Sequence, residues 1–260
     1  MVGRSLCRLL VSEGWQVSGT TRSAHKAELL KGLGVLPVIV DVYDEAALRE
    51  HMLHAAPEIV VHQLTDLSGL TDPQQISTVL AQNARLREEG TRSLVAAAAA
   101  AGARRMVAQS IAFAYAPGPR PYKEDAALAV DDAQRGQTAR AVASLEQQVL
   151  GGPFESLVLR YGKFYGAGSG ADQAPAGGAV HVHAAADAAR RALTHGAAGI
   201  YNIAEQDGTV SSAKLSPNWA GTLPFVWRPN DPHRHCHSPG RLATAFHCGS
   251  FFHPQDAQHR

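Results

Sequence analysis

Residues 83–115 carry the pattern that decides the fold: NARLREEGTRSLVAAAAAAGARRMVAQSIAFAY. The part up to Ala101 favours a long helix that ends at Gly102, since glycine commonly follows the last helical residue. Arg104 and Arg105 then indicate a basic turn, and the apolar run after them predicts a buried strand. Ser110 lies near the carboxyl end of that strand. In open parallel sheets these strand ends form the ligand crevice, so the stretch places a hydroxyl where chemistry would occur.

Helices and strands alternate on both sides of this stretch. Before it, the pattern predicts helices over 3–13, 24–32 and 45–54 and strands over 16–21, 35–42 and 58–65. After it, a proline-rich loop leads to a helix over 138–150, a strand over 156–165, a helix over 184–195 and a short strand over 200–204. This order favours right-handed βαβ units and a parallel sheet, which is the α/β class.

The overall composition is that of an ordinary soluble globular chain. Of its 260 residues, 45% are hydrophobic and 18% charged, and the net charge is +1. Charge therefore indicates neither a nucleic acid nor a membrane as a partner. No apolar run is long enough to cross a bilayer, and the N-terminus has no signal-peptide pattern. Three widely spaced cysteines, Cys7, Cys236 and Cys248, argue against a disulfide framework, so we expect a reducing cytoplasm.

The composition changes after Lys214. Residues 215–260 are rich in Pro, His, Trp and Phe and show no sustained period, which predicts an irregular tail. His233, His235, Cys236 and His237 are dense enough to suggest zinc, but they lack the paired Cys-x-x-Cys spacing of structural sites. We therefore expect no metal site.

Several short motifs follow one another in a recognisable order. They are Gly90-Thr91-Arg92-Ser93-Leu94, Leu159-Arg160 with Tyr165-Gly166, His181-Val182 and Tyr201-Asn202-Ile203. Together, they resemble the extended short-chain dehydrogenase/reductases, in particular the NAD-dependent epimerase/dehydratase group. The resemblance implies a Rossmann-type doubly wound parallel sheet. It divides the chain into an NAD(P)-binding domain over 1–165, a reduced substrate-binding lobe with a returning strand over 166–214, and the tail.

The dinucleotide site implied by the resemblance is only partly present. Members of the family hold the pyrophosphate on a Gly-x-x-Gly-x-x-Gly turn between the first strand and the first helix. Gly3 stands in the place of the third glycine, while the first strand and the other two glycines are missing. Either the recorded start lies downstream of the true one, or the chain has lost the middle of its phosphate site.

Other positions indicate which dinucleotide, NADP or NAD, the chain would bind. Arg22 follows the second strand, where an arginine favours the phosphate of NADP over NAD, although a solvated helix-start residue is an equal interpretation. Asp41 resembles the acid that meets the adenine edge, although strand-end aspartates also serve as helix caps. The resemblance adds Leu64, Asn83 and Arg160 as cofactor-binding residues.

The catalytic residues of the family are incomplete. Ser110 falls on the catalytic serine, whose hydroxyl would bond a substrate carbonyl or hydroxyl. The Tyr-x-x-x-Lys pair, in which lysine lowers the tyrosine pKa and the phenol transfers a proton, is replaced by Thr138 and Val142. Neither side chain can do that chemistry. Tyr165, beside Lys163, is the tyrosine that could substitute, although in relatives it more often shapes the pocket.

Two classes of function stay open. The first is an NAD(P)-dependent epimerase/dehydratase-like oxidoreductase acting on a small hydroxyl or carbonyl substrate, with a nucleotide sugar as one candidate. The second is a non-catalytic NAD(P)-binding sensor or scaffold that has lost the Tyr-x-x-x-Lys pair. A truncated or rearranged gene product without cofactor affinity is a third interpretation. The helices near 74–101 and 138–150 could pair two subunits, as they do in relatives, to form a homodimer.

Overall fold

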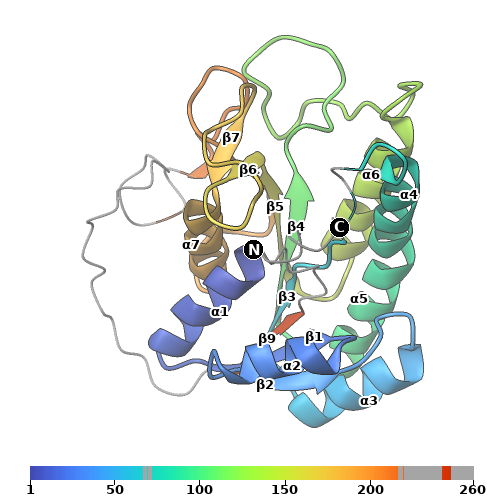
Figure 1. The fold of residues 1–260 in the computed structure, drawn as a ribbon, viewed down its shortest axis with the longest axis vertical. Helices are drawn as coiled ribbons and strands as arrows, with labels where there is room; N and C mark the ends of the chain where they lie inside the picture. The colour runs from blue at the N-terminus through green and yellow to red at the C-terminus, as the bar shows by residue number, and fades with distance from the viewer. Residues whose placement is uncertain (67–68, 70–71, 216–218, 220–241, 247–260) are drawn as a thin grey trace.

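The computed structural model describes residues 1–66, 69, 72–215 and 219 and the backbone of 242–246. Its centre is a seven-stranded sheet in the order β2-β1-β9-β3-β4-β5-β8, and all neighbouring strands are parallel (Figure 1). The strands are β1 (Gln16–Thr21), β2 (Leu36–Ile39), β3 (Ile59–His62), β4 (Arg105–Ile111), β5 (Glu155–Tyr161), β8 (Gly199–Ile203) and β9 (Leu242–Phe246). A small parallel pair is formed by β6 (Lys163–Tyr165) and β7 (Ala179–His181).

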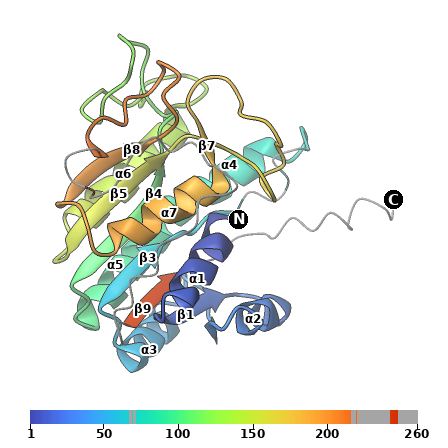
Figure 2. The same ribbon diagram turned by 90° about the vertical axis from the view of Figure 1, so that its left-hand side faces the viewer.

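Helices cover both faces of the sheet, which confirms the doubly wound Rossmann-type prediction (Figure 1, Figure 2). One face carries α1 (Val2–Ser12), α2 (Ala24–Lys31) and α7 (Val182–Ala192). The other carries α3 (Glu45–Ala55), α4 (Ile76–Arg85), the π-helical turn η1 (Leu86–Gly90), α5 (Thr91–Ala100) and α6 (Gly136–Leu150). Because successive strand residues face opposite ways, Val61 packs in the first core and Val60 in the second.

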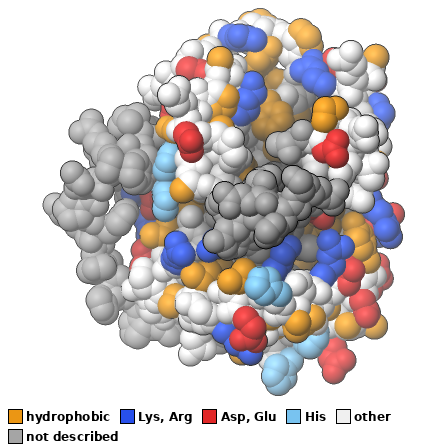
Figure 3. Space-filling view, viewed as in Figure 1, with side chains coloured by type: hydrophobic (Ala, Val, Ile, Leu, Met, Phe, Trp, Pro, Cys, Tyr) orange, Lys and Arg blue, Asp and Glu red, His pale blue; other side chains and the backbone are white. Residues whose placement is uncertain are grey.

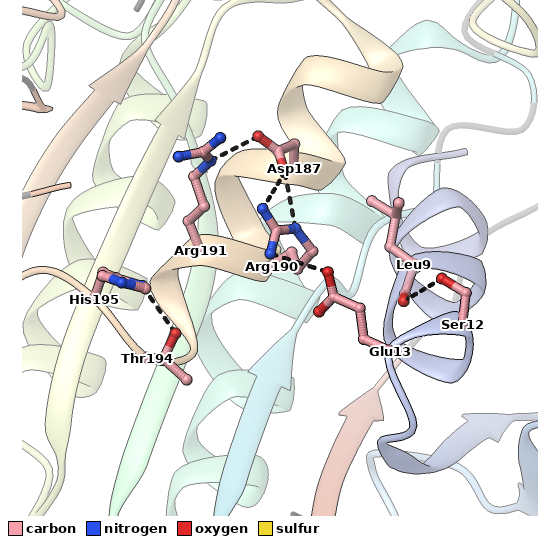
Figure 4. Close-up of polar contacts among 8 residues, drawn as sticks. All are labelled: Leu9, Ser12, Glu13, Asp187, Arg190, Arg191, Thr194 and His195. Carbon is pink, nitrogen blue, oxygen red and sulfur yellow. Dashed lines mark hydrogen bonds and ion pairs between the residues drawn. The ribbon is translucent and has the colours of Figure 1, made fainter. Parts of the chain in front are cut away.

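Helices α1 and α7 are tied together by charge as well as by apolar packing. The Arg190 guanidinium contacts Glu13 at 3.1 Å and Asp187 at 2.7 Å, and Arg191 contacts the other oxygen of Asp187 at 2.8 Å (Figure 4). The two arginines hold the pKa of Asp187 below its usual range, against the effect of burial. The end of α1 is therefore fastened to α7.

Strand β9 lies between β1 and β3 and is parallel to both. Thr244 is in register with Ser18 on one side and with Val60 on the other. The prediction of an irregular tail is therefore wrong for residues 242–246, because a five-residue strand with distant partners has no local signature. The remaining tail, including the histidines and cysteines considered for zinc, lies outside the described residues. The strands β1 and β2 lie on one side of β9, and β3, β4, β5 and β8 lie on the other, so the strand order reverses at β9. Doubly wound sheets bind ligands at such a reversal.

Most element boundaries follow the sequence pattern. Gly102 ends α5 with φ +74°, in agreement with the predicted stop. The predicted long helix before it is three elements, with a π-helical turn in the middle, and the strand predicted over 156–165 is divided into β5 and β6. Within the described part of the chain, no helix has the length and apolar character required to cross a membrane. Figure 3 shows acidic and basic side chains interspersed on one face, which suits the net charge near zero.

Candidate functional site

A pocket of about 210 Å³ opens beside the carboxyl ends of β1, β2 and β3. It is lined by Arg22, Asp41, Val42, Tyr43, Asp66, Gln82, Arg85 and Leu86. Arg22 lies 3.4 Å from Asp66, and Asp41 accepts a hydrogen bond of 3.0 Å from the backbone N–H of Tyr43. Two residues predicted to bind the cofactor, Arg22 and Asp41, are therefore brought together in one pocket.

Two further residues of this pocket were not identified from the sequence. The guanidinium of Arg85 lies 4.2 Å from the centre of the Tyr43 ring and forms a 2.8 Å ion pair with Glu89. The hydrogen bond and charge of Glu89 raise the pKa of Arg85. Tyr43 stands two residues after Asp41, but Arg85 is on α4, so only the packing of that helix reveals the pair.

Leu64 and Asn83 shape the loop that follows β3. The Leu64 N–H donates to Nδ1 of His62 (3.3 Å), which leaves Nε2 to donate to Thr91 Oγ1 (2.8 Å). Asn83 accepts from the N–H of Asp66 (3.1 Å) and donates to the carbonyls of Asp66 and Val79. Both predicted cofactor residues are buried and hold the crevice wall in place.

The amide of Gln63 is buried directly after the end of β3. Its side chain is 2% exposed, and neither Oε1 nor Nε2 meets the geometry of a hydrogen bond among the described residues. The Tyr161 hydroxyl lies near this amide and donates to the Ala185 carbonyl at 3.2 Å. Buried polar groups are nearly always paired, so an orphaned amide at a strand end fits a polar ligand such as a dinucleotide in the crevice.

Ser110 and Arg160 form a buried network behind the crevice. The Ser110 hydroxyl donates to Glu146 (2.7 Å), and Arg160 binds the same carboxylate through Nε (2.8 Å) and Nη2 (2.6 Å). Burial opposes the charge of Arg160, but the hydrogen bonds and ion pair with Glu146 outweigh it and raise its pKa. The side chains are 2% and 3% exposed. The structure thus gives both residues an internal partner, in place of the substrate and cofactor contacts expected from the sequence.

Thr138 and Val142 occupy the positions expected for the tyrosine and the lysine. Val142 is fully buried on α6 and forms an apolar cluster, here called the apolar wall, with Ile111, which follows Ser110, and with Ala114. Thr138 lies one turn earlier on α6 and is half-buried. Neither position therefore carries a group that titrates near neutral pH.

Tyr165 lies on β6 and is engaged in the substrate-side lobe. Its hydroxyl donates to Glu205 at 2.5 Å, and its ring meets His181 edge-on at 5.0 Å. Burial and the Glu205 carboxylate raise the pKa of Tyr165 to about 12, so the phenol stays protonated at neutral pH. Lys163 donates to the Ala176 carbonyl at 2.9 Å instead of forming a Tyr-Lys pair.

Gly3 lies buried in the first turn of α1, and α1 packs on the face of the sheet that also holds Gln63. A doubly wound parallel sheet with a polar pocket and an orphaned amide at its strand ends defines a Rossmann-type dinucleotide-binding protein. Residues 1–150 match the family described as NAD(P)H-binding.

A relative and several solved structures are similar to this chain. A protein named 3-diazoavenalumate denitrifying reductase, from Streptomyces sp, is 40% identical over 245 residues, which cover 86% of this chain and 78% of that protein. UDP-glucose 4-epimerase from Thermotoga maritima superposes with a TM-score of 0.64 at 18% identity, covering 80% of this chain and 75% of that one. WbmG from Bordetella bronchiseptica, solved with NAD, gives a TM-score of 0.63 at 16% identity, covering 93% of this chain and 81% of that one, so both structures share the fold of this chain. The chain belongs to the NAD(P)H-binding family and has an NAD(P)-binding domain.

Proposed function

We propose that the chain is an NAD(P)H-dependent reductase that replaces the diazo group of a carboxylate substrate by hydrogen and releases N₂. The support comes from the Streptomyces relative, whose name describes a reduction with loss of nitrogen from a diazo carboxylate. This substrate class differs from the nucleotide sugar suggested by the family resemblance. The structures of nucleotide-sugar enzymes are less than 20% identical to this chain and support the fold alone.

The observation that carries the proposal is the apolar wall of Ile111, Ala114 and Val142. Oxidation or reduction at a C–O centre moves a proton on or off oxygen, and neither Thr138 nor Val142 can supply it. Bound NAD(P)H would supply a hydride that forms the new C–H bond while the C–N₂⁺ bond breaks, N₂ leaves with the bonding pair, and the positive charge passes to the nicotinamide. This reaction balances without a proton. A site without the Tyr-x-x-x-Lys pair is therefore suited to it.

The residues of the chain would then bind and orient the dinucleotide and the substrate, and they would exclude water. Arg22, Asp41 and Tyr43, which line one pocket, would hold the adenosine end of the dinucleotide. The free amide of Gln63 would satisfy a polar group nearer the reacting end. Ile111 and Val142 would keep water away from the diazonium substrate, whose N₂ group leaves easily.

The test is to follow the hydrogen into the product. Diazotised 4-aminobenzoate is incubated with the protein and NADPH deuterated at the transferable position, against a control without protein. We expect N₂ release equal to NADPH oxidation and deuterium from the cofactor in the benzoate product. A product that carries hydrogen from the solvent in place of deuterium from the cofactor, or no rate above the control, would contradict the proposal. Epimerisation of UDP-glucose would instead support the nucleotide-sugar alternative.

A second candidate is the non-catalytic NAD(P)-binding sensor or scaffold. It is favoured by the commitment of Ser110 to Glu146 and of Tyr165 to Glu205, since each hydroxyl already donates its proton to a carboxylate of the protein. Dinucleotide binding without turnover of either the diazo or the nucleotide-sugar probe would support this candidate.

A further inference from the structure

Arg87 occupies a position from which it faces the end of β3. It lies on η1, four residues after Asn83 and four before Thr91, and residues at this spacing share one side of a helix. Asn83 bonds the loop after β3 through Asp66, and Thr91 bonds His62 on β3 itself. Arg87 is thus flanked on its helix face by two residues that contact the tip of the strand.

The charge of Arg87 has no protein partner. In the part of the chain that the structure describes, no carboxylate or carbonyl oxygen forms a hydrogen bond or ion pair with its guanidinium. The side chain is nevertheless half-buried, and desolvation lowers its pKa to about 10. The contrast with Arg85, which has both Glu89 and the ring of Tyr43, is plain. A desolvated guanidinium without a counter-ion is normally explained by an anion that binds there.

Arg87 lies close to the end of β3. Its positive charge adds to the effect of burial in lowering the pKa of His62, the last residue of β3, to about 4. Helix α6 packs against η1, and Gln148 of α6 donates to the Glu88 carbonyl at 3.2 Å. At Val142, where the resemblance places the lysine, α6 contributes no charge. Arg87 on η1 therefore offers a cation near the end of β3.

We propose that Arg87 is an oxyanion-binding residue of the crevice. A guanidinium offers two parallel N–H donors, which match the paired oxygens of a carboxylate or a phosphate. The inference rests on the proposed function for the two possible sources of the oxyanion. The substrate would supply a carboxylate, and the dinucleotide would supply phosphates. Arg87 would orient the ligand that carries the group.

Binding measurements with Arg87→Met and Arg87→Lys test the assignment, with Arg49→Met as the matched control because Arg49 is exposed on α3. The probes are NADPH, inorganic pyrophosphate, and benzoate in the presence of saturating NADP⁺. We expect Arg87→Met to weaken the binding of one class of probe by about tenfold or more, Arg87→Lys to restore part of the loss, and Arg49→Met to change nothing. If NADPH and pyrophosphate bind more weakly, the group that Arg87 binds is a phosphate. If only benzoate binds more weakly, the group is a carboxylate.

A thermal melt of the ligand-free protein separates binding from a structural role. Since Arg87→Met removes an unpaired buried charge, its Tm should equal or exceed that of the wild type. A lower Tm, or affinities for all three probes within about twofold of the wild type, would overturn the assignment. No diazo substrate enters these measurements. A failure of N₂ release would therefore overturn the proposed function and leave the binding result standing.

Discussion

Arg160 is the residue on which the interior of the sheet depends most. It forms two hydrogen bonds with the buried carboxylate of Glu146, and the same carboxylate accepts the Ser110 hydroxyl. Arg160→Met should destabilise the protein by about 3–5 kcal/mol, because it leaves the buried charge of Glu146 without its counter-charge. Ser110→Ala should cost only about 1 kcal/mol and leave NADPH binding unchanged. Urea unfolding and fluorescence titration measure both. Loss of turnover in Ser110→Ala at unchanged stability would restore the substrate role suggested by the sequence.

His62 makes stability sensitive to acid. Burial lowers its pKa to about 4 from an ordinary 6.5, so below pH 6.5 the unfolded chain binds a proton that the folded chain refuses. The free energy of unfolding should therefore fall as the pH drops from 6.5 to 4, with a contribution on the order of 3 kcal/mol from this residue. Urea titrations at several pH values check it. An equally steep fall in His62→Gln would show that other groups are responsible.

Arg22 is the residue on which the preference for NADP depends. Its ion pair with Asp66 is long at 3.4 Å, and the arginine side chain is 47% exposed at the edge of the pocket. If Arg22 binds the 2′-phosphate, Arg22→Gln should weaken NADPH by about tenfold and leave NADH unchanged. Nicotinamide fluorescence gives both affinities. Equal losses for the two cofactors would place Arg22 outside the phosphate site.

At the scale of elements, β9 joins the two halves of the sheet, because it lies between β1 and β3. It supplies the backbone hydrogen-bonding partners of both β1 and β3. A chain that ends at residue 241 would leave two unpaired edges in the centre of the sheet, and we expect it to lose cooperative unfolding. A chain that ends at residue 246 keeps β9 and is the control. If both versions unfold with the same midpoint and slope in urea, the central strand does not stabilise the fold.

At the scale of the whole molecule, the resemblance predicts a homodimer through α5 and α6. A surface groove of about 680 Å³ runs between them, lined by Glu88, Arg92, Val95, Ala96, Ala99, Ser144 and Gln148. Light scattering should give twice the chain mass of 27.5 kDa, and an Ala96→Glu, Ala99→Glu double variant should give one chain mass. Leu53→Glu, at an exposed position on α3, is the matched control. A monomeric wild type would refute the prediction.

The sequence by itself determined the α/β class, the alternation of helices and strands over most of the described chain, and two residues, Arg22 and Asp41, of the pocket beside the ends of β1 and β2. These features rest on local periodicity, on Gly102 as a helix stop, and on Arg22 and Asp41 at strand ends, all of which can be read over short stretches. Arg105 was expected in a turn but begins β4, where it is buried and bonds the Ala192 carbonyl at 2.7 Å.

Only the tertiary structure decided the rest. The strand in the centre of the sheet, the pairing of Ser110 and Arg160 with Glu146, and the lack of a partner for Gln63 and Arg87 depend on residues far apart in the chain. The local periodicity of a sequence predicts which face of a helix or strand a side chain lies on, but not which group it contacts there. For that reason the class of protein was readable from the sequence, whereas the division between supporting and ligand-facing residues was not.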